Sequence, residues 1–287
     1  MKIVTDSAAD LTAEDRQDLP ITVAPLLINF PEGEVRSDDL TPDQFYNRLE
    51  AMAPQVPTTS QPSGGDFAKI YQELGPEAGQ ILSIHISSGL SGTIGAAELG
   101  AQKTPDVNVQ HFDTLTLSGG ERFHVLAAAH MAQAGERLET ILERLRAIRA
   151  ATEVIYTLET LDYLARGGRI GRVQALAGSL LKIKPIIYVD KKDGKYDQLG
   201  RERTIKRSLE KIAANLADKF GDQPLWVSVM HGRFAEQAEQ LSALLSKQLK
   251  IGKLEVLRIS PVLGVHTGPG IVGAAVTPLA LMEPALK

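Results

Sequence analysis

Residues 80–93, QILSIHISSGLSGT, hold the pattern that decides the fold of this 287-residue chain. Residues 80–86 form a mostly apolar run of strand length, which is typical of a strand in the centre of a sheet. The serine- and glycine-rich segment that follows predicts a turn, and a helix is expected from about Thr93. Strand, turn and helix in this order indicate a mostly parallel sheet that is covered by helices.

Similar segments extend on both sides of this stretch. In the N-terminal half, apolar runs fall at residues 2–5, 21–29 and 107–112, and helices are predicted after Thr41, after Ser63 and at residues 119–134 and 138–148. In the C-terminal half, strands are predicted at residues 154–157, 183–189, 195–200, 225–230 and 254–259, and helices at residues 161–166, around Leu176, Leu180 and Leu181, and at residues 204–220 and 234–249. The Asp-Gly in residues 191–194 favours a hairpin, which makes the second sheet mixed. We therefore expect two α/β domains, residues 1–155 with a mostly parallel sheet and residues 156–287 with a mixed sheet.

Composition excludes several functional classes. The net charge is −4, with Lys and Arg scattered among Asp and Glu, so the basic surface that nucleic acids require is not expected. The chain has no cysteine, and its six histidines show no paired ligand spacing, so no metal site is expected. The first residues lack the features of a signal peptide, which favours the cytoplasm.

A long segment without charge, residues 259–282, has the length of a membrane span. Pro261, Pro269 and Pro278 interrupt it, and each proline would leave backbone groups unsatisfied in lipid. We interpret the segment as buried protein interior.

Two loops rich in hydroxyl groups could hold an anion. One is residues 57–63, PTTSQPS, and the other is residues 87–93, SSGLSGT, between a predicted strand and helix. Hydroxyls and free backbone N–H groups at a helix start suit an anion, although helix capping explains the same residue types. A serine hydrolase with Ser91 as nucleophile and His266 as base is the alternative, but Thr93 stands where the nucleophile elbow needs glycine.

Two further segments combine glycine with residues that bind anions. Residues 166–172, RGGRIGR, could recognise phosphate or an acidic partner surface, or form a solvated helix end. In residues 264–270, GVHTGPG, a ligand could approach His266 closely, although a lone histidine is more often a core residue. Arg201 and Arg203 could reach the same anion or simply be surface residues. Asp6 and Ser7, after the first strand, could form a site or a cap.

Taken together and in order, these segments resemble the DegV family of bacterial fatty-acid-binding proteins, and the likeness covers nearly the whole chain. The matching segments are residues 3–7 with Asp10-Leu11, then 59–63, 86–88 with 90–93, 161–164 through 167–170, 184–186 and 266–270.

The resemblance implies two α/β domains that enclose an acyl tunnel. It implies that the chain carries a long-chain fatty acid, such as palmitate, to a separate dihydroxyacetone-kinase-like fatty acid kinase, which phosphorylates the carboxyl group to an acyl phosphate. The sequence leaves open whether the lipid serves phospholipid synthesis or signalling. Thr59 and Ser91 would hydrogen-bond the carboxylate, His266 and Arg203 would lie at the head group, and Arg169 would meet the kinase. The chain has Gly171-Arg172 where many family members carry other residues.

The resemblance therefore predicts a lipid-binding carrier subunit with no catalytic residue and no cofactor. The expected carboxylate site comprises Thr59, Ser60, Ser91, Gly92, Thr93, Arg203, His266, Thr267 and Gly268, and the expected kinase-docking residues are Arg169 and Arg172. The protein is expected to be a monomer with transient membrane contact. About fourteen buried methylenes would contribute on the order of 11 kcal/mol before the costs of binding, which requires a long apolar cavity.

Overall fold

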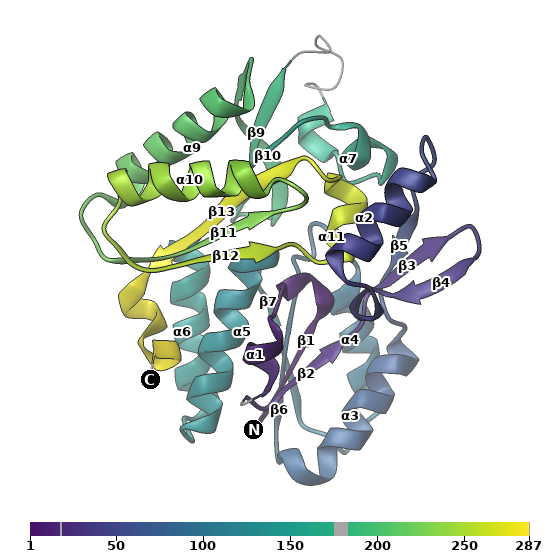
Figure 1. The fold of residues 1–287 in the computed structure, drawn as a ribbon. Helices are drawn as coiled ribbons and strands as arrows, with labels where there is room; N and C mark the ends of the chain where they lie inside the picture. The colour runs from purple at the N-terminus through teal and green to yellow at the C-terminus, as the bar shows by residue number, and fades with distance from the viewer. Residues whose placement is uncertain (18, 175–182, 287) are drawn as a thin grey trace.

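The computed structural model describes residues 1–17, 19–174 and 183–286, in which three sheets are covered by helices (Figure 1). The helix expected around Leu176, Leu180 and Leu181 lies outside the described residues.

Sheet A is the parallel sheet that the sequence predicts. Its strand order is β2-β1-β6-β7, and all its pairs are parallel. The strands are β1 (Lys2–Asp6), β2 (Ile21–Ala24), β6 (Ile81–His85) and β7 (Val109–Asp113). Helices α3 (Gly64–Ala78) and α4 (Thr93–Gln102) pack on each other and against β6. The start of α4 confirms the helix expected from Thr93.

Sheet C is mixed, as the hairpin in the sequence indicates. Its order is β10-β9-β8-β13-β11-β12, in which β11 and β12 are parallel and the other pairs antiparallel. The strands are β8 (Glu153–Leu158), β9 (Lys184–Asp190), β10 (Lys195–Glu202), β11 (Leu225–His231), β12 (Ile251–Arg258) and β13 (Ile271–Pro278). Helices α9 (Ile205–Phe220) and α10 (Ala235–Gln248) cover its outer face (Figure 1).

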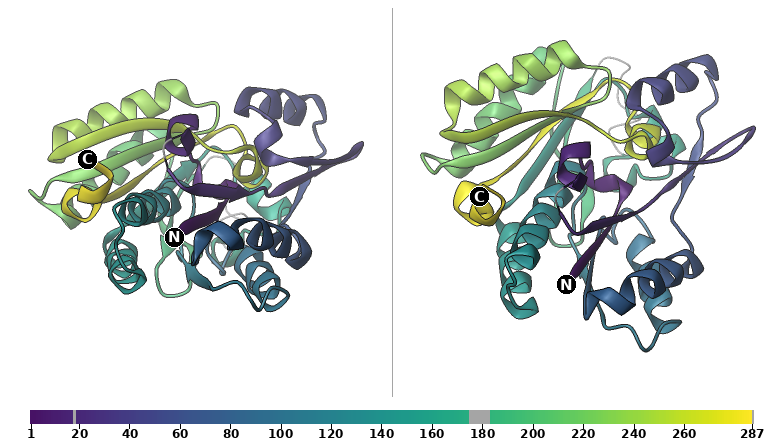
Figure 2. Two further views of the ribbon diagram at one scale, coloured as in Figure 1. Left: turned by 90° about the horizontal axis from the view of Figure 1, so that it is seen from below. Right: turned by 60° about the horizontal axis from the view of Figure 1, so that its bottom comes forward.

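A helical layer joins the two sheets. Helix α5 (Ser118–Gln133) contacts β1 and β6 of sheet A and also β8, β11 and β13 of sheet C, while α6 (Leu138–Ala151) packs beside it (Figure 2). The rings of Phe123 on α5 and Trp226 on β11 lie 5.7 Å apart in one continuous apolar core. The domain boundary expected near residue 155 stays a prediction, and the chain enters sheet C at β8.

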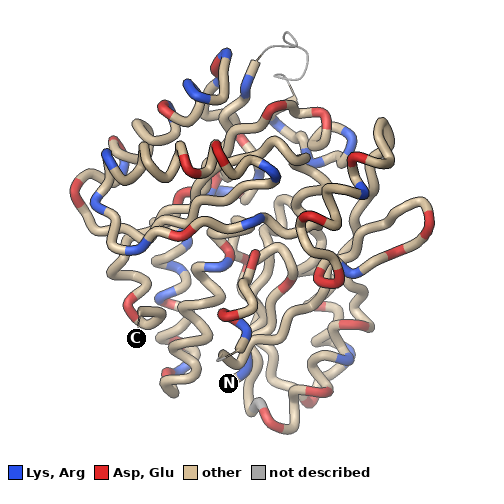
Figure 3. The backbone as a smooth tube through the Cα atoms, viewed as in Figure 1, with Lys and Arg blue, Asp and Glu red and all other residues tan. Residues whose placement is uncertain are grey.

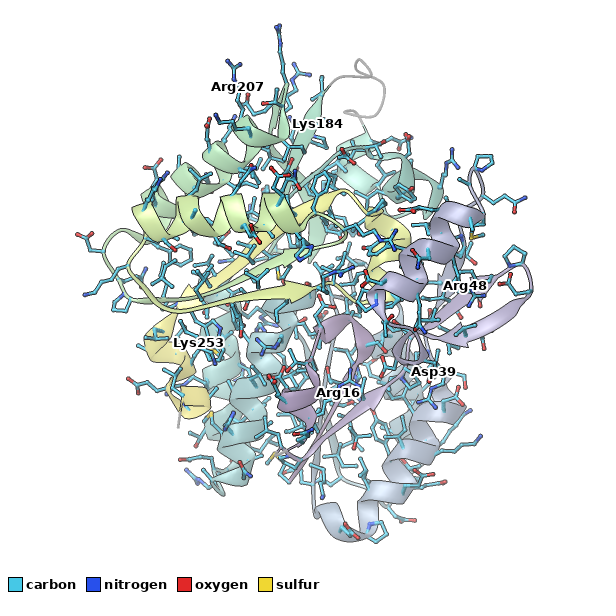
Figure 4. All side chains as sticks on the ribbon, viewed as in Figure 1. Arg16, Asp39, Arg48, Lys184, Arg207 and Lys253 are labelled. Atoms are coloured by element: carbon cyan, nitrogen blue, oxygen red, sulfur yellow. The ribbon has the colours of Figure 1, made fainter. Side chains whose placement is uncertain are left out.

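The apolar run of residues 21–29 forms two strands in different sheets. Pro25 lacks a backbone donor and stands between β2 and β3. The small antiparallel sheet B has the order β4-β3-β5, and its strands are β3 (Leu27–Phe30), β4 (Gly33–Arg36) and β5 (Thr58–Ser60). Helix α2 (Pro42–Ala51) is tied to this sheet by Arg48, whose guanidinium lies 3.7 Å from the centre of the Phe30 ring (Figure 4).

The uncharged segment is protein interior, as expected. It forms α11 (Pro261–Thr267), the central strand β13 and the start of η4 (Leu279–Leu286). Among the described residues, no helix has the length and apolar character of a membrane span. Charged residues of both signs are interspersed along the rest of the chain (Figure 3).

Short elements complete the described chain. They are η1 (Ser7–Ala9), α1 (Ala13–Gln17), η2 (Ser37–Asp39), α7 (Asp162–Arg166) and η3 (Gly171–Val173).

Candidate functional site

A pocket lies where the segments that follow β2 and β6 of sheet A meet α11. Such a position, outside the carboxyl ends of parallel strands, is the common ligand position in α/β sheets. The space not filled by protein atoms is about 520 Å³, the open mouth included. The apolar part of the wall includes Leu26, Ile86, Leu90, Leu117, Val262 and Leu263. The polar part comprises Thr59, Ser60, Gln61, Ser91, Arg169 and His266.

Two segments far apart in the chain meet at Thr59 and His266. Thr59 is held in β5 by its pairing with Ile28 of β3, and His266 projects from α11. Thr59 Oγ1 and His266 Nε2 are 2.8 Å apart, which is hydrogen-bonding distance. The contact brings together two of the residues that the family resemblance assigns to one head-group site.

The imidazole of His266 lies directly against the backbone of Gly167. A Cβ atom built on Gly167 would collide with His266 Nδ1, and this nitrogen has no hydrogen-bond partner among the described residues. Burial, together with the positive charge of Arg169, lowers the pKa of His266 to about 4. His266 is therefore neutral at pH 7.

On the opposite loop, Ser91 is supported from behind by Thr93. The two hydroxyl oxygens are 2.7 Å apart, and the backbone N–H of Thr93 also donates to Ser91 Oγ at 3.3 Å. The Thr93 side chain is buried, and its hydroxyl contacts Ser91 Oγ, which holds the Ser91 side chain at the pocket wall. Gly92 packs against the amide of Gln61, so this loop also contacts the segment that follows β5.

The anchoring of α11 depends on contacts between segments that are far apart in the chain. Asp10 Oδ1 accepts a hydrogen bond from the backbone N–H of Ser260 at 2.8 Å, and Ser37 Oγ accepts one from Val262 N at 3.1 Å. Asp10 also accepts a hydrogen bond from Ser118 at the start of α5, beside Leu117 of the pocket. Burial raises the pKa of Asp10 to about 6, and these hydrogen bonds oppose the shift. Asp10 thus joins two walls of the pocket.

A second buried network has the residue types of a hydrolase triad but cannot reach a substrate. Ser83 Oγ lies 2.7 Å from His85 Nε2, and His85 Nδ1 lies 3.0 Å from Asp6 Oδ2. All three side chains are fully enclosed, and the hydroxyl of Tyr71 closes the other end of the chain of contacts. Asp6 also accepts hydrogen bonds from Ile86 N and Ala8 N, so it caps η1 and supports the loop after β6.

The structure brings only part of the expected carboxylate site to the pocket wall. Thr59, Ser60, Ser91 and His266 line the pocket, whereas Gly92 and Thr93 lie directly behind Ser91. The Thr267 hydroxyl donates a hydrogen bond to Leu263 O at 3.0 Å. Gly268, at φ 72°, packs against the ring of Tyr163. Neither residue lines the pocket. Arg203 is exposed beyond the end of β10 and is not among the lining residues, so its expected role at the head group stays a prediction.

The two arginines expected to meet a kinase have different surroundings. Arg169 lines the pocket, and its guanidinium donates to the carbonyl oxygens of Gly167 at 2.9 Å and Leu90 at 3.4 Å. Arg172 is bound by three carboxylates of the β9–β10 hairpin, namely Asp190, Asp193 and Asp197. The position of Arg169 at the pocket was not evident from sequence, because it depends on the packing of α7 beside α11.

The chain is similar to known proteins along most of its length. A family model described as "Uncharacterised protein, DegV family" matches residues 1–279. A DegV domain-containing protein of Deinococcus radiodurans is 37% identical over 277 residues, which cover 96% of this chain and 95% of the relative.

Two solved structures are similar along nearly their whole length. One is a DegV family protein from Thermus thermophilus whose structure is described as showing fatty acid binding. It is 34% identical to this chain with a TM-score of 0.90, and the match covers 96% of this chain and 99% of the Thermus chain. A stearic-acid-binding protein from Eubacterium ventriosum is 29% identical with a TM-score of 0.86 and covers 96% and 98%.

Proposed function

Because this chain belongs to the DegV family, we propose that it binds one long-chain fatty acid in the pocket between sheet A and α11. The acyl chain would lie among the apolar side chains of the wall, and the carboxylate would lie at Thr59 and Ser91. The observation that carries the proposal is the pairing of an apolar wall with two hydroxyls that are each supported from behind. The fatty acid ligands of the solved relatives support the same ligand class.

The hydrogen bond behind Thr59 determines what its hydroxyl can offer. His266 is neutral, so only one of its ring nitrogens carries a proton. A buried N–H without an acceptor is costlier than a bare lone pair, and Nδ1 has no partner among the described residues, which favours the proton on Nε2. His266 then donates to Thr59 Oγ1, and the Thr59 hydroxyl remains free to donate to a carboxylate.

The same logic applies to Ser91. The Thr93 hydroxyl is fully buried and needs an acceptor, and Ser91 Oγ lies 2.7 Å away. If Thr93 donates to Ser91, the Ser91 O–H is free to point at the ligand. Two hydroxyl donors compensate a carboxylate without neutralising it, and Arg169 supplies the positive charge at the pocket wall.

A carboxylate held by hydroxyls keeps oxygen lone pairs that can attack a phosphoryl group. We therefore extend the proposal to presentation: the head group is offered to a separate fatty acid kinase, which transfers phosphate to it, and the acyl phosphate serves phospholipid synthesis. In this proposal the protein contributes binding and orientation, and the kinase contributes the chemistry. Arg169, at the pocket wall and next to the exposed Gly168, is the residue proposed to meet the kinase.

The serine hydrolase alternative finds less support in the geometry. Both of its residues, Ser91 and His266, line the pocket. However, the ring nitrogen that a nucleophilic serine would need, Nε2, is bonded to Thr59, and Nδ1 has no carboxylate partner among the described residues. A triad requires both contacts.

Arg169→Ala is expected to lower acyl phosphate formation about tenfold or more, because an arginine at the centre of an interface often carries that share of binding. The assay supplies the kinase, ATP and protein that is preloaded with stearic acid, and it traps the acyl phosphate with hydroxylamine. The control is Arg207→Ala, a cation that Figure 4 shows at the outer edge of the molecule on α9. Equal rates for wild type and Arg169→Ala at equal loading would reject the docking assignment, and a kinase that works equally well without the protein would reject presentation.

A further inference from the structure

The turn of the β9–β10 hairpin, residues 191–194, packs onto the loop that carries Ser91. Ser87 lies in the loop that follows β6. Its side chain is fully buried, and its hydroxyl donates a hydrogen bond to Gly194 O at 2.8 Å. A Cβ atom on Gly194 would collide with Ser87 Oγ, and one on Gly89 would collide with the carbonyl oxygen of Asp193. The hairpin turn and the loop are therefore in direct backbone contact.

Ser87 transmits this contact to the pocket wall. Its carbonyl oxygen accepts hydrogen bonds from both Leu90 N and Ser91 N, each at 3.0 Å. Leu90 and Ser91 both line the pocket. A shift of the hairpin turn would therefore move Ser87 and, with it, the hydroxyl that is proposed to hold the carboxylate.

Arg172 fixes the hairpin turn itself. Its guanidinium bonds Asp190 at 3.2 Å, Asp197 at 2.9 Å and also Asp193 within the turn. Without this cation, three carboxylates would repel one another at the end of one hairpin. A single exposed ion pair contributes little, but one arginine shared by three carboxylates forms a network.

The segment that carries Arg172 also makes a second contact with the loop that carries Ser91. Arg169, three residues earlier, donates to the carbonyl oxygen of Leu90. The loop with Ser91 thus lies between two contacts that both originate in residues 169–172. We propose that Arg172 is a positioning residue of the ligand site, which holds the hairpin turn against Ser87 and thereby holds Ser91 at the head group. The proposal rests on the proposed function for the identity of the ligand, whereas the contact between turn and loop does not depend on it.

The test compares Arg172→Ala and Asp193→Asn with Lys211→Ala. Lys211 forms an ion pair with Glu202 at the far end of β10, at 3.6 Å, and is not among the residues that line the pocket. Two readouts are used: the rate at which bound stearic acid exchanges for its deuterated form, by native mass spectrometry, and amide hydrogen exchange of residues 87–92. We expect both Arg172→Ala and Asp193→Asn to speed stearate exchange about threefold to tenfold and to deprotect the loop amides, with an unchanged melting temperature. The control should match wild type.

A purely structural role of Arg172 would lower the melting temperature without a selective change in residues 87–92. Stearate exchange and loop protection within twofold of wild type in both variants would overturn the proposal. If wild type itself retains no stearic acid, the proposed function fails, and loop hydrogen exchange still decides whether Arg172 holds the turn.

Discussion

Gly167→Ala is expected to weaken stearic acid binding about tenfold or more, although residue 167 has no side chain to offer the ligand. Its backbone is ordinary, at φ −76° and ψ −5°, so alanine meets no conformational penalty there. The new methyl group would instead collide with His266 Nδ1 and lie 2.9 Å from Cε1. The ring must move, and its hydrogen bond to Thr59 is lost with it. Without this bond the Thr59 hydroxyl is no longer held toward the carboxylate, and loss of a hydrogen bond to a charged ligand costs about 1.5–3 kcal/mol.

The matched control for this change is Gly95→Ala. Gly95 lies in α4, close in sequence to Ser91, and a Cβ atom there meets nothing within 4 Å. Alanine is the better helix former by about 1 kcal/mol, so this variant should melt slightly higher and bind stearic acid like wild type. Titration calorimetry of both variants makes the comparison. Wild-type affinity in Gly167→Ala would show that the position of His266 is unimportant for binding.

Thr59→Val is expected to reduce stearic acid affinity by about tenfold to one hundredfold and to leave methyl stearate affinity unchanged. Valine keeps the shape and the strand preference of threonine in β5 but removes the hydroxyl. The carboxylate would lose a donor worth about 1.5–3 kcal/mol, whereas the methyl ester carries no charge to be compensated. The comparison of the two ligands separates the head-group contact from a change in packing.

The control for Thr59→Val is Thr58→Val, one residue earlier in the same strand. Thr58 is exposed and does not line the pocket, and its oxygen contacts Asn29 at 3.4 Å. Displacement of a fluorescent fatty acid measures the affinities of wild type and of both variants for both ligands. An equal loss for stearic acid and methyl stearate in Thr59→Val would contradict the proposed contact, and so would no loss at all.

Most of the fold could be predicted because its strands and helices carry local signals. The strand and turn of residues 80–92 and the helix from Thr93 are where the sequence pattern indicates. Sheet B is less evident, because β5 consists of two threonines and a serine, which indicate a loop as readily as a strand. Strand β13 was not predicted either. It is buried on both faces in the middle of sheet C, so it has no alternation of polar and apolar residues.

The candidate site is predictable in its residue types but not in its arrangement. Hydroxyl-rich loops and a histidine among glycines indicate the segments, and the family resemblance singles out Thr59, Ser91 and His266 within them. The structure brings all three to one pocket. The contact of His266 with Gly167 and the bond from Asp10 to Ser260 join segments 99 and 250 residues apart, and no local pattern encodes them. Residues that position a site through such contacts carry no signal of their own in a single sequence.

Native mass spectrometry of the purified protein, followed by denaturing extraction of bound small molecules, shows whether the chain holds a fatty acid. We expect one bound molecule per chain, which extraction identifies as a long-chain fatty acid with a free carboxyl group. Protein depleted of this ligand should take up added stearic acid to the same one-to-one ratio. A ligand-free protein that takes up no added fatty acid would rule out fatty acid binding as the function of the pocket.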